Sequence, residues 1–548
     1  MAIKRYVANS DTTITNAYQA NLTTRGTASN MGRADSLEVF SIYAQESSGS
    51  SELSRILIGF PISEISTDRT NGVLPASGSV NFVLRMFNAV TPNTVPRNFT
   101  LVATAVSGAE PNAGGEISFN WQEGNGIDME NYTDVTRDGV GANWMNMGSS
   151  SIAGLVKWGN QGAPSAGGVY FDEPDKSTFT QTFDIGTEDL EIDITPLVEQ
   201  WVNSAGNVLG TKPNYGIGVH LTASQEVLVL AGDATTAVPA NTAGDKRSYY
   251  DKKFFARSSE FFFKRPVIEA RWDSATKDDR GTFFYSSSLA TADENLNTLF
   301  LYNYFRGELR NIPRIGTDKI YVSIFSGSAD NSAPDDTEVI KLVADGVHVR
   351  AAHRYVITGS YVSTGIYSAS FALTAASTPL TDMFDVWFSG SKAITSAFTA
   401  PIQFHTGSFE PEKIVLSPQN PATRVVTSVT NLKPIYSVEE TARFRVFTRQ
   451  KDWNPTIYTR AVSTVRPTIV ESGSYAIRRV IDGVRAIEFG TGSLLHTQMS
   501  FDASGSYFDL DMGLLEPGYA YALKFAYYNG SIGSWQEQPQ EFKFRVEE

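Results

Sequence analysis

Few side chains in this chain of 548 residues have the type and spacing needed for catalysis. The absence of cysteine excludes a disulfide, a thiolate metal site and a cysteine nucleophile. The histidines are far apart, at His220, His348, His353, His405 and His496. His348 and His353 would lie on opposite faces of a continuous strand. We therefore expect no zinc site and no enzyme, since no Gly-x-Ser-x-Gly, Walker or His-Glu-x-x-His motif is present.

Pairs of carboxylates are the next candidates, because glycoside hydrolysis needs two of them roughly 5–10 Å apart across a sugar cleft. The pairs lie in turn-like sequence, at Asp172 and Asp175, Glu188 and Asp189, Asp278 and Asp279, Asp335 and Asp336, and Asp509 and Asp511. Turn residues of this kind are usually solvated, which is the reading we adopt. Asp and Asn oxygens also suit calcium, so a structural calcium ion stays open and no other cofactor is expected.

Aromatic residues offer two binding surfaces. Trp121, Trp144 and Trp158 lie in a loop-rich stretch at 107–181 and could stack on sugar rings, or fill the space beneath the loops. Phe261, Phe262 and Phe263 are consecutive, so they cannot all face one core. If they form a strand, its second face is a candidate contact with a partner subunit.

The composition argues against two classes of binding partner, nucleic acids and membranes. A net charge of −14 argues against nucleic acid, which is held by clustered Lys and Arg. Residues 1–9 include basic side chains but no apolar signal-peptide segment follows. No apolar run approaches the ~20 residues that span a bilayer. We therefore expect synthesis in the cytoplasm and no membrane partner.

Alternating apolar residues predict a fold made of short β-strands bounded by Gly, Pro, Asn and Asp. The clearest examples are residues 80–87, 319–325, 442–447, 519–525 and 541–546. One short helix is predicted at 196–202, with Thr195 as its cap and Pro196 in its first turn. Trp201 should plug the end of a sandwich, with sugar stacking as the alternative. The fold class is all-β.

Two polar stretches divide the chain into domains of ordinary size. The first follows a strand at 265–272, which should complete the first sandwich. The second follows residues 399–407, where a strand leads into the proline-containing stretches at 410–413 and 417–421. The expected domains are 1–273, with insertions at 107–181 and 231–252, then 274–408 and 409–548.

The first domain resembles the DNRLRE-type sandwich family, which is related to carbohydrate-binding modules. The matching segments are residues 55–66, read as a strand, 80–87, 121–126, 141–144, 190–202, 214–221, 254–260 and 265–272. The resemblance implies a jelly-roll-like sandwich over residues 1–273. Two immunoglobulin-like β-sandwiches are expected after it.

The whole chain is similar to virion structural proteins of tailed phages, especially marine myoviruses, on residues 1–18 and 260–272. This similarity implies a non-enzymatic virion component, such as a fibre, collar or neck, tail or head-decoration protein. Its partners would be other virion proteins and further copies of itself. The alternative is an adhesin that binds a glycan of the host surface, and a glycan-degrading enzyme is a third hypothesis.

Overall fold

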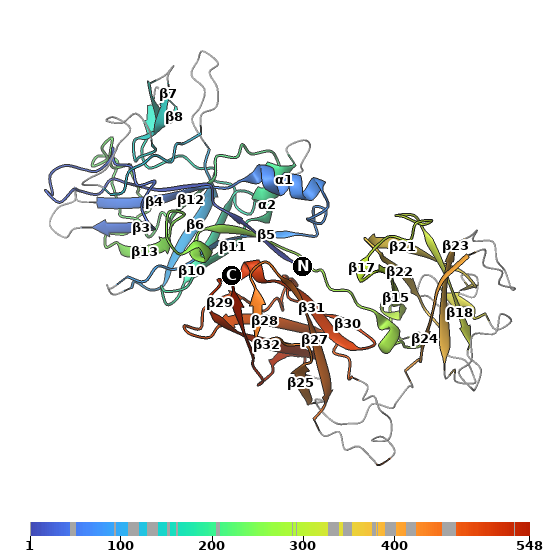
Figure 1. Ribbon diagram of the computed structural model, residues 1–548. Helices are drawn as coiled ribbons and strands as arrows, with labels where there is room; N and C mark the ends of the chain where they lie inside the picture. The colour runs from blue at the N-terminus through green and yellow to red at the C-terminus, as the bar shows by residue number, and fades with distance from the viewer. Residues whose placement is uncertain are drawn as a thin grey trace. The chain divides into compact units, whose positions relative to one another are not determined.

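The computed structural model shows a mostly β chain with several antiparallel sheets (Figure 1). Its residues group into two compact units: residues 2–273 with 494–496, and residues 274–493 with 497–548. The structure describes residues 2–43, 51–91, 95–107, 120–128, 141–150, 154–160, 163–203, 209–287, 289–291, 293–326, 339–343, 353–374, 380, 382–389, 402–412, 424–451, 457, 467–530 and 532–548.

The first unit is built on two main sheets. One has the order β1-β14-β5-β11, formed by Ile3–Val7, Val267–Arg271, Asn81–Met86 and Leu190–Asp193. The other has the order β10-β6-β12-β4-β3-β13, with β2 paired to β4. Its strands are β10 Thr178–Phe183, β6 Phe99–Ala105, β12 Ile217–Leu221, β4 Ser51–Gly59, β3 Ser36–Tyr43, β13 Tyr249–Phe255 and β2 Ser10–Thr15.

The last strand of this unit lies inside its sheet. β14 pairs with β1 on one side, from Ile3 opposite Arg271 to Val7 opposite Val267. It pairs with β5 on the other side, where Ile268 lies opposite Leu84. The strand predicted at 265–272 is therefore present, and the sheet is continuous only when it is in place.

Alternation along the strands builds the main core of the first unit. Ile56 and Ile58 of β4 and Leu84 of β5 are fully buried in one hydrophobic cluster. Phe99 of β6 and Phe183 of β10 stack with ring centroids 5.1 Å apart in the same cluster. Residues at every second position thus supply the buried face that the pattern predicted.

Helix α1, Ile62–Thr70, corrects one sequence prediction. The segment 55–66 was expected to be a strand throughout, but β4 ends at Gly59 and the helix begins after Pro61. Ile62 and Ile65 are the buried residues of the helix, at the i, i+3 spacing of one helix face. The apolar residues after Pro61 therefore follow a helical period.

Helix α2, Thr195–Val202, confirms the predicted short helix, but its cap differs from the prediction. Thr195 is already helical, and its hydroxyl accepts the backbone N–H of Phe82 at 2.7 Å. Asp193 instead accepts the backbone N–H of Thr195 at 2.9 Å. Trp201 is buried in the main core, as expected for a plug. No helix in the described residues is both long and apolar enough to span a bilayer.

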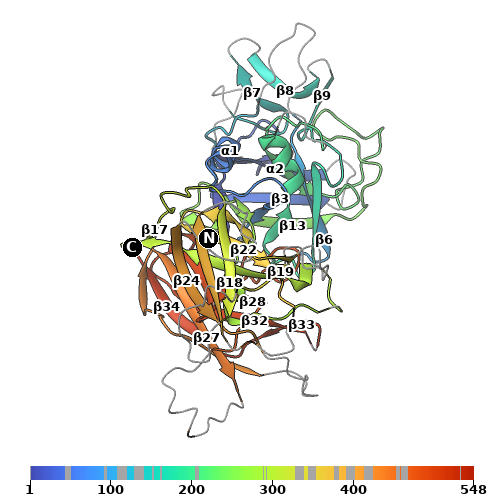
Figure 2. The same ribbon diagram turned by 90° about the vertical axis from the view of Figure 1, so that its right-hand side faces the viewer.

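An inserted three-stranded sheet, β7-β8-β9, belongs to the same unit. Its strands are β7 Asn146–Ser150, β8 Gly154–Asn160 and β9 Ala163–Ser165. Figures 1 and 2 both show β7 and β8 apart from the main sheets of the unit, and Figure 2 also shows β9 beside them. The insertion is part of the stretch at 107–181 that was expected to be loop-rich.

In the second unit, the described part of residues 274–412 holds one six-stranded sheet of order β15-β22-β21-β18-β23-β24. The strands are β15 Asn297–Tyr302, β22 Ile366–Phe371, β21 Ile357–Ser363, β18 Ile320–Ser326, β23 Met383–Ser389 and β24 Ile402–Phe409. Two short pairs accompany it: β16 Tyr304–Phe305 with β17 Glu308–Leu309, and β19 Leu342–Val343 with β20 His353–Arg354. Trp387 is fully buried in its core.

The described residues between 424 and 547 form two facing sheets. The first has the order β25-β27-β31-β30, formed by Val425–Val429, Thr441–Gln450, Gly505–Asp511 and Ser500–Asp502. The second has the order β26-β34-β32-β28-β29, with β33 beside β32. Its strands are β26 Ile435–Ser437, β34 Phe542–Glu547, β32 Ala520–Asn529, β28 Gly473–Arg479, β29 Arg485–Ile487 and β33 Ser534–Glu537. Aromatic rings from both sheets fill the space between them: the ring centroid of Phe444 in β27 lies 5.8 Å from that of Phe544 in β34, and both rings are buried.

Candidate functional site

The three tryptophans proposed for sugar stacking are buried. Trp144 and Trp158 are fully buried and Trp121 nearly so, in a second hydrophobic cluster with Leu53 and Leu57 of β4. Each indole N–H donates to a backbone carbonyl at 2.8–2.9 Å. A buried ring offers no face to a sugar, so the stacking interpretation does not fit this placement. The indoles instead fill the space beneath the inserted segments, which was the alternative from the sequence.

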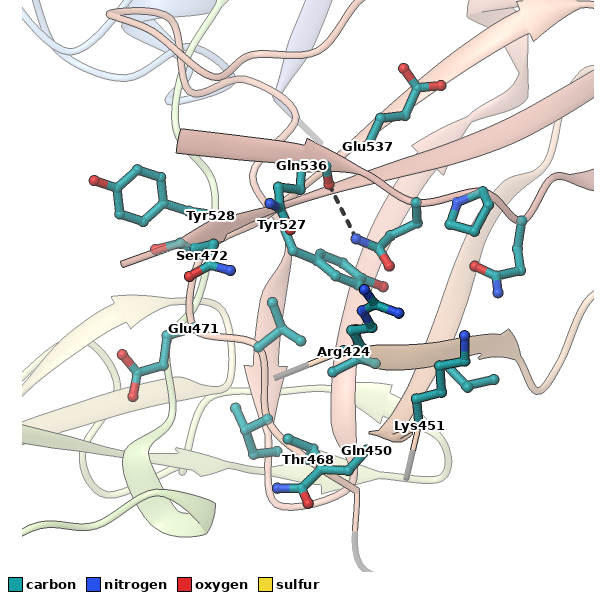
Figure 3. Close-up of a pocket in the computed structure, with 18 of the residues that line it drawn as sticks. Arg424, Gln450, Lys451, Thr468, Glu471, Ser472, Tyr527, Tyr528, Gln536 and Glu537 are labelled. Carbon is teal, nitrogen blue, oxygen red and sulfur yellow. Dashed lines mark hydrogen bonds between the residues drawn. The ribbon is translucent and has the colours of Figure 1, made fainter. Parts of the chain in front are cut away.

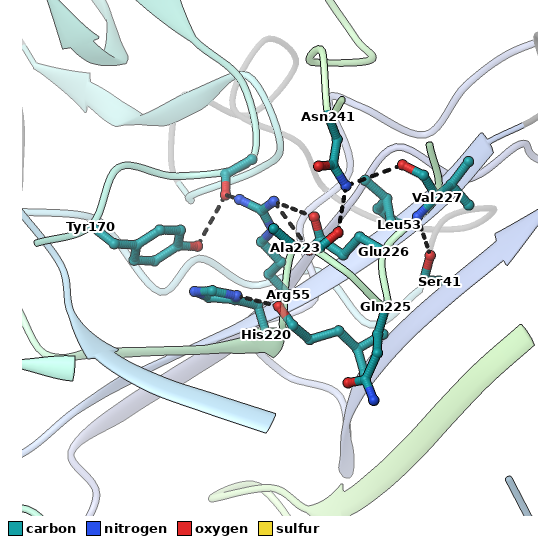
Figure 4. Close-up of polar contacts among 12 residues, drawn as sticks. Ser41, Leu53, Arg55, Tyr170, His220, Ala223, Gln225, Glu226, Val227 and Asn241 are labelled. Carbon is teal, nitrogen blue, oxygen red and sulfur yellow. Dashed lines mark hydrogen bonds and ion pairs between the residues drawn. The ribbon is translucent and has the colours of Figure 1, made fainter. Parts of the chain in front are cut away.

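Arg55 joins these insertions to the main sheet (Figure 4). From β4, its guanidinium contacts the carboxylate of Glu226 at 3.0–3.2 Å and donates to the carbonyl of Gly167 at 2.9 Å. Tyr170 donates to the same carbonyl at 3.0 Å. The guanidinium also lies 5.6 Å from the ring centroid of Trp144. One buried cation therefore anchors the segments around residues 167 and 226.

Tyr170 and His220, which lie near the ion pair of Arg55 and Glu226, are held in their neutral forms. Burial raises the pKa of Tyr170 to about 12. Burial, and then the positive charge of Arg55, lower the pKa of His220. Nδ1 of His220 lies 2.7 Å from the carbonyl oxygen of Leu221, so that nitrogen carries the proton. A neutral phenol, a neutral imidazole and a paired arginine support packing rather than proton transfer.

The three consecutive phenylalanines form an exposed turn rather than a strand. Phe262 begins a short 3₁₀ helix, η1, Phe262–Lys264. Pro266 has no N–H to donate to a sheet, and the pairing of β14 begins after it. The strand interpretation was therefore wrong for these residues.

This turn leaves aromatic surface in contact with solvent. Phe261 is 41% exposed and Phe262 is 53% exposed. Lys264 lies with its ammonium 5.5 Å from the ring centroid of Phe261, and the guanidinium of Arg265 lies 5.0 Å from that of Phe262. We call Phe261, Phe262 and Phe263, with these two cations, the aromatic ridge.

The carboxylates proposed for catalysis or calcium mostly hold local structure. Glu188 accepts the backbone N–H groups of Ile185 and Gly186, both at 2.6 Å. Asp509 forms a bidentate ion pair with Arg443, in which Nε and Nη2 of the arginine donate to the two carboxylate oxygens. Asp335, Asp336 and His348 lie outside the described residues. Among the residues that the structure describes, no three His, Asp or Glu side chains gather as metal ligands.

A groove of about 750 Å³ opens at the edge of the sandwich formed by residues 424–547 (Figure 3). Arg424, Gln450 and Lys451 line it from the ends of β25 and β27. Tyr527 lines it from β32 and Gln536 from β33. The volume lies in the range of ligand pockets, about 300–1,000 Å³.

The charges in this groove are unevenly matched. Glu537 binds Lys524 at 2.7 Å, whereas the side chains of Arg424 and Lys451, which also line the groove, form no ion pair with another described residue. Tyr527 is fixed by a 2.8 Å hydrogen bond between its hydroxyl and Oγ1 of Thr427, and burial raises the pKa of this phenol to about 12. Two cations that form no ion pair within the described part of the chain therefore lie beside a fixed, neutral aromatic group.

Sequence reasoning did not find this groove. Its one local signal is the spacing of Gln536, Gln538 and Gln540, since alternate residues of an extended segment share a side. The cations come from positions about 90 to 110 residues earlier, which no local pattern connects to the glutamines.

No protein-family model and no curated protein matches the chain. Among solved structures, trypsin-activated alpha-2-macroglobulin from Escherichia coli is similar at 10% identity, covering 85% of this chain and 30% of that chain, with a TM-score of 0.13. Salmonella alpha-2-macroglobulin reacted with methylamine gives 9% identity, 100% and 34% coverage, and a TM-score of 0.14. The chain thus spans about a third of their length. At these TM-scores the likeness carries no argument about fold or function.

Proposed function

We propose that this protein is a non-enzymatic structural subunit of a bacteriophage particle. It is made in the host cytoplasm and docks on other virion proteins, including further copies of itself. Support comes from the resemblance of residues 1–18 and 260–272 to segments of virion proteins, described in the sequence analysis. The mostly β architecture is compatible with a DNRLRE-like sandwich over residues 1–273, followed by two immunoglobulin-like domains. A series of sandwiches of this kind suits a fibre, collar, tail or head-decoration role.

The observation that carries the proposal is the aromatic ridge. Large aromatic side chains dominate the energetics of interfaces. Phe261 and Phe262 are about half exposed, although the chain has ample core in which to bury aromatic rings. Covering roughly 100 Å² of each ring would contribute about 2–3 kcal/mol per residue. The ridge would then form the centre of an interface of about 1,000 Å² or more.

The proposal is tested by replacing the exposed rings in a phage that encodes the chain. Phe261→Ser with Phe262→Ser should abolish incorporation into purified particles, measured by mass spectrometry, while the soluble protein stays folded. Tyr304 and Phe305 in β16 are similarly exposed, at 53% and 51%, and their replacement by Ser is the matched control. Normal incorporation of the Phe261/Phe262 variant would exclude docking through the ridge.

Cross-linking of intact particles tests the role itself. Inter-protein links should concentrate in residues 1–273, with Lys264 among the linked positions. Links confined to residues 410–548 would mean that the protein docks on the particle through its C-terminal part rather than through residues 1–273. Absence of the protein from purified particles would refute the proposed structural role.

A further inference from the structure

The groove of the sandwich at 424–547 lies in a different unit from the aromatic ridge. Binding at the groove would therefore be a second function, separate from docking through the ridge. We infer that this groove binds a carbohydrate that carries a single carboxylate group. Arg424 and Lys451 would hold the carboxylate, and the glutamine amides would pair with hydroxyl groups. Whether the groove binds this carbohydrate does not depend on whether the protein is a structural subunit of a phage particle.

The chemistry of the lining favours a sugar. Each hydroxyl of a sugar both donates and accepts, and a side-chain amide offers an acceptor and two donor hydrogens in one plane. Gln450, Gln536, Gln538 and Gln540 provide such amides around the groove. An apolar peptide or lipid chain would leave these polar groups unpaired, at a substantial energetic penalty.

The two cations specify an acidic ligand. The backbone N–H of Lys451 donates to the carbonyl of Arg424 at 2.7 Å, so the two residues are neighbours across the strand pair. Both side chains carry a positive charge, and no described side chain forms an ion pair with either one. A ligand carboxylate would supply the missing charge, and a guanidinium binds carboxylates through two parallel hydrogen bonds.

The remaining charges limit the ligand to one acidic group within the groove. Glu471 and Glu537 both line the groove. Lys524 already compensates Glu537, but a second ligand anion near Glu471 would meet a like charge. A densely charged polyanion such as nucleic acid is therefore disfavoured, in keeping with the net charge of −14. A sugar acid set among neutral sugars meets both conditions.

The groove also has a firm surface on which a ligand can rest. The ring of Tyr527 points toward Arg424 in the close-up view (Figure 3), and the hydrogen bond to Thr427 fixes its position. Gln538 donates from its amide to the backbone carbonyl of Gln536 at 3.2 Å. Prearranged side chains of this kind reduce the entropy lost on binding.

The test uses the intact protein and an array of defined oligosaccharides. The array contains glycans with uronic or nonulosonic acids, each beside its carboxyl-reduced, neutral counterpart. We expect binding to acidic members and at least tenfold weaker binding to the reduced ones, measured by titration calorimetry on the best member. Raising the salt concentration should weaken the acidic complex.

Variants locate the site. Arg424→Gln with Lys451→Gln should weaken binding of the acidic glycan at least tenfold and leave the near-ultraviolet circular dichroism spectrum unchanged. Arg485→Gln with Arg545→Gln removes the same charge from exposed positions of the same sandwich, and should bind as the unmodified protein does. The inference is overturned if no acidic glycan binds, if the reduced glycan binds equally well, or if the Arg424/Lys451 variant retains full affinity.

Discussion

The ion pair of Arg55 and Glu226 leads to a prediction whose size follows from the structure. Nε and Nη2 of the arginine lie 3.0–3.2 Å from the carboxylate. The side chains are only 14% and 8% exposed. Loss of one partner from a buried pair leaves an unpaired charge and costs about 3–5 kcal/mol. We expect Arg55→Met and Glu226→Leu each to reduce the local free energy of unfolding by about this amount.

The double variant should lose less stability than either single variant. Replacing a whole buried ion pair by apolar side chains is often neutral. The remaining loss should be about 1 kcal/mol, because the Gly167 carbonyl keeps only Tyr170 as a donor. Arg443→Met is the matched control, since Arg443 binds Asp509 in similar geometry but is 40% exposed. Exposed pairs are worth about 0–1 kcal/mol.

Hydrogen exchange measured by mass spectrometry on the intact chain can read these local differences. Because 1.4 kcal/mol corresponds to a tenfold change, each single variant should exchange roughly 10²–10⁴-fold faster in peptides covering β4 and β12. Peptides from residues 424–547 should be unchanged and serve as an internal reference. Unmodified exchange rates in both single variants would refute the assigned role of the pair. A double variant less stable than both single variants would refute its energetics.

Three further predictions concern the first unit. Trp201→Ala should cost about 3–5 kcal/mol in denaturant unfolding, and a loss below about 1 kcal/mol would contradict its burial. Burial raises the pKa of Asp11 to about 7, above its unfolded value of about 3.9, so its stabilising contribution is complete below about pH 4 and is lost as the pH rises through 7. Asp11→Asn should therefore gain melting temperature over the unmodified protein between pH 4 and 7, and parallel pH profiles would exclude this. A fragment of residues 1–273 should unfold cooperatively, whereas 1–255, which lacks the interior strand β14, should not; equal cooperativity would count against the pairing.

Strands with regular alternation could be predicted closely from the sequence. The segment at 319–325 matches β18, Ile320–Ser326, and the segment at 541–546 matches β34, Phe542–Glu547. Helix α1 was missed because its two buried residues, Ile62 and Ile65, directly follow an apolar strand. Over so short a stretch, a period of two and a period of 3.6 are hard to separate.

Long-range packing accounts for the features that local patterns could not predict. Trp144 and Trp158 are buried because the inserted segment folds back over the outer face of β4, a contact between residues far apart in sequence. The groove is likewise assembled from five separate segments, at residues 424–426, 450–451, 468–472, 527–530 and 536–540. Residue type alone left sugar stacking and packing beneath the loops as alternatives for the tryptophans, and only their burial in the folded chain favours packing.

The pairing of β1 with β14 has a consequence for synthesis on the ribosome. Arg5 of β1 and Glu269 of β14, which lie 2.8 Å apart in the folded unit, are separated by 264 positions in the chain. At a translation rate of roughly 5–20 residues per second, Glu269 is synthesised roughly 13–53 s after Arg5. Throughout that delay the unpaired backbone of β1 is a template for aggregation. Lys4 and Arg5 place two positive charges on this segment, which oppose its association with other chains before β14 is made. In the folded sheet, Arg5 then stabilises the pairing of β1 with β14 through its ion pair with Glu269.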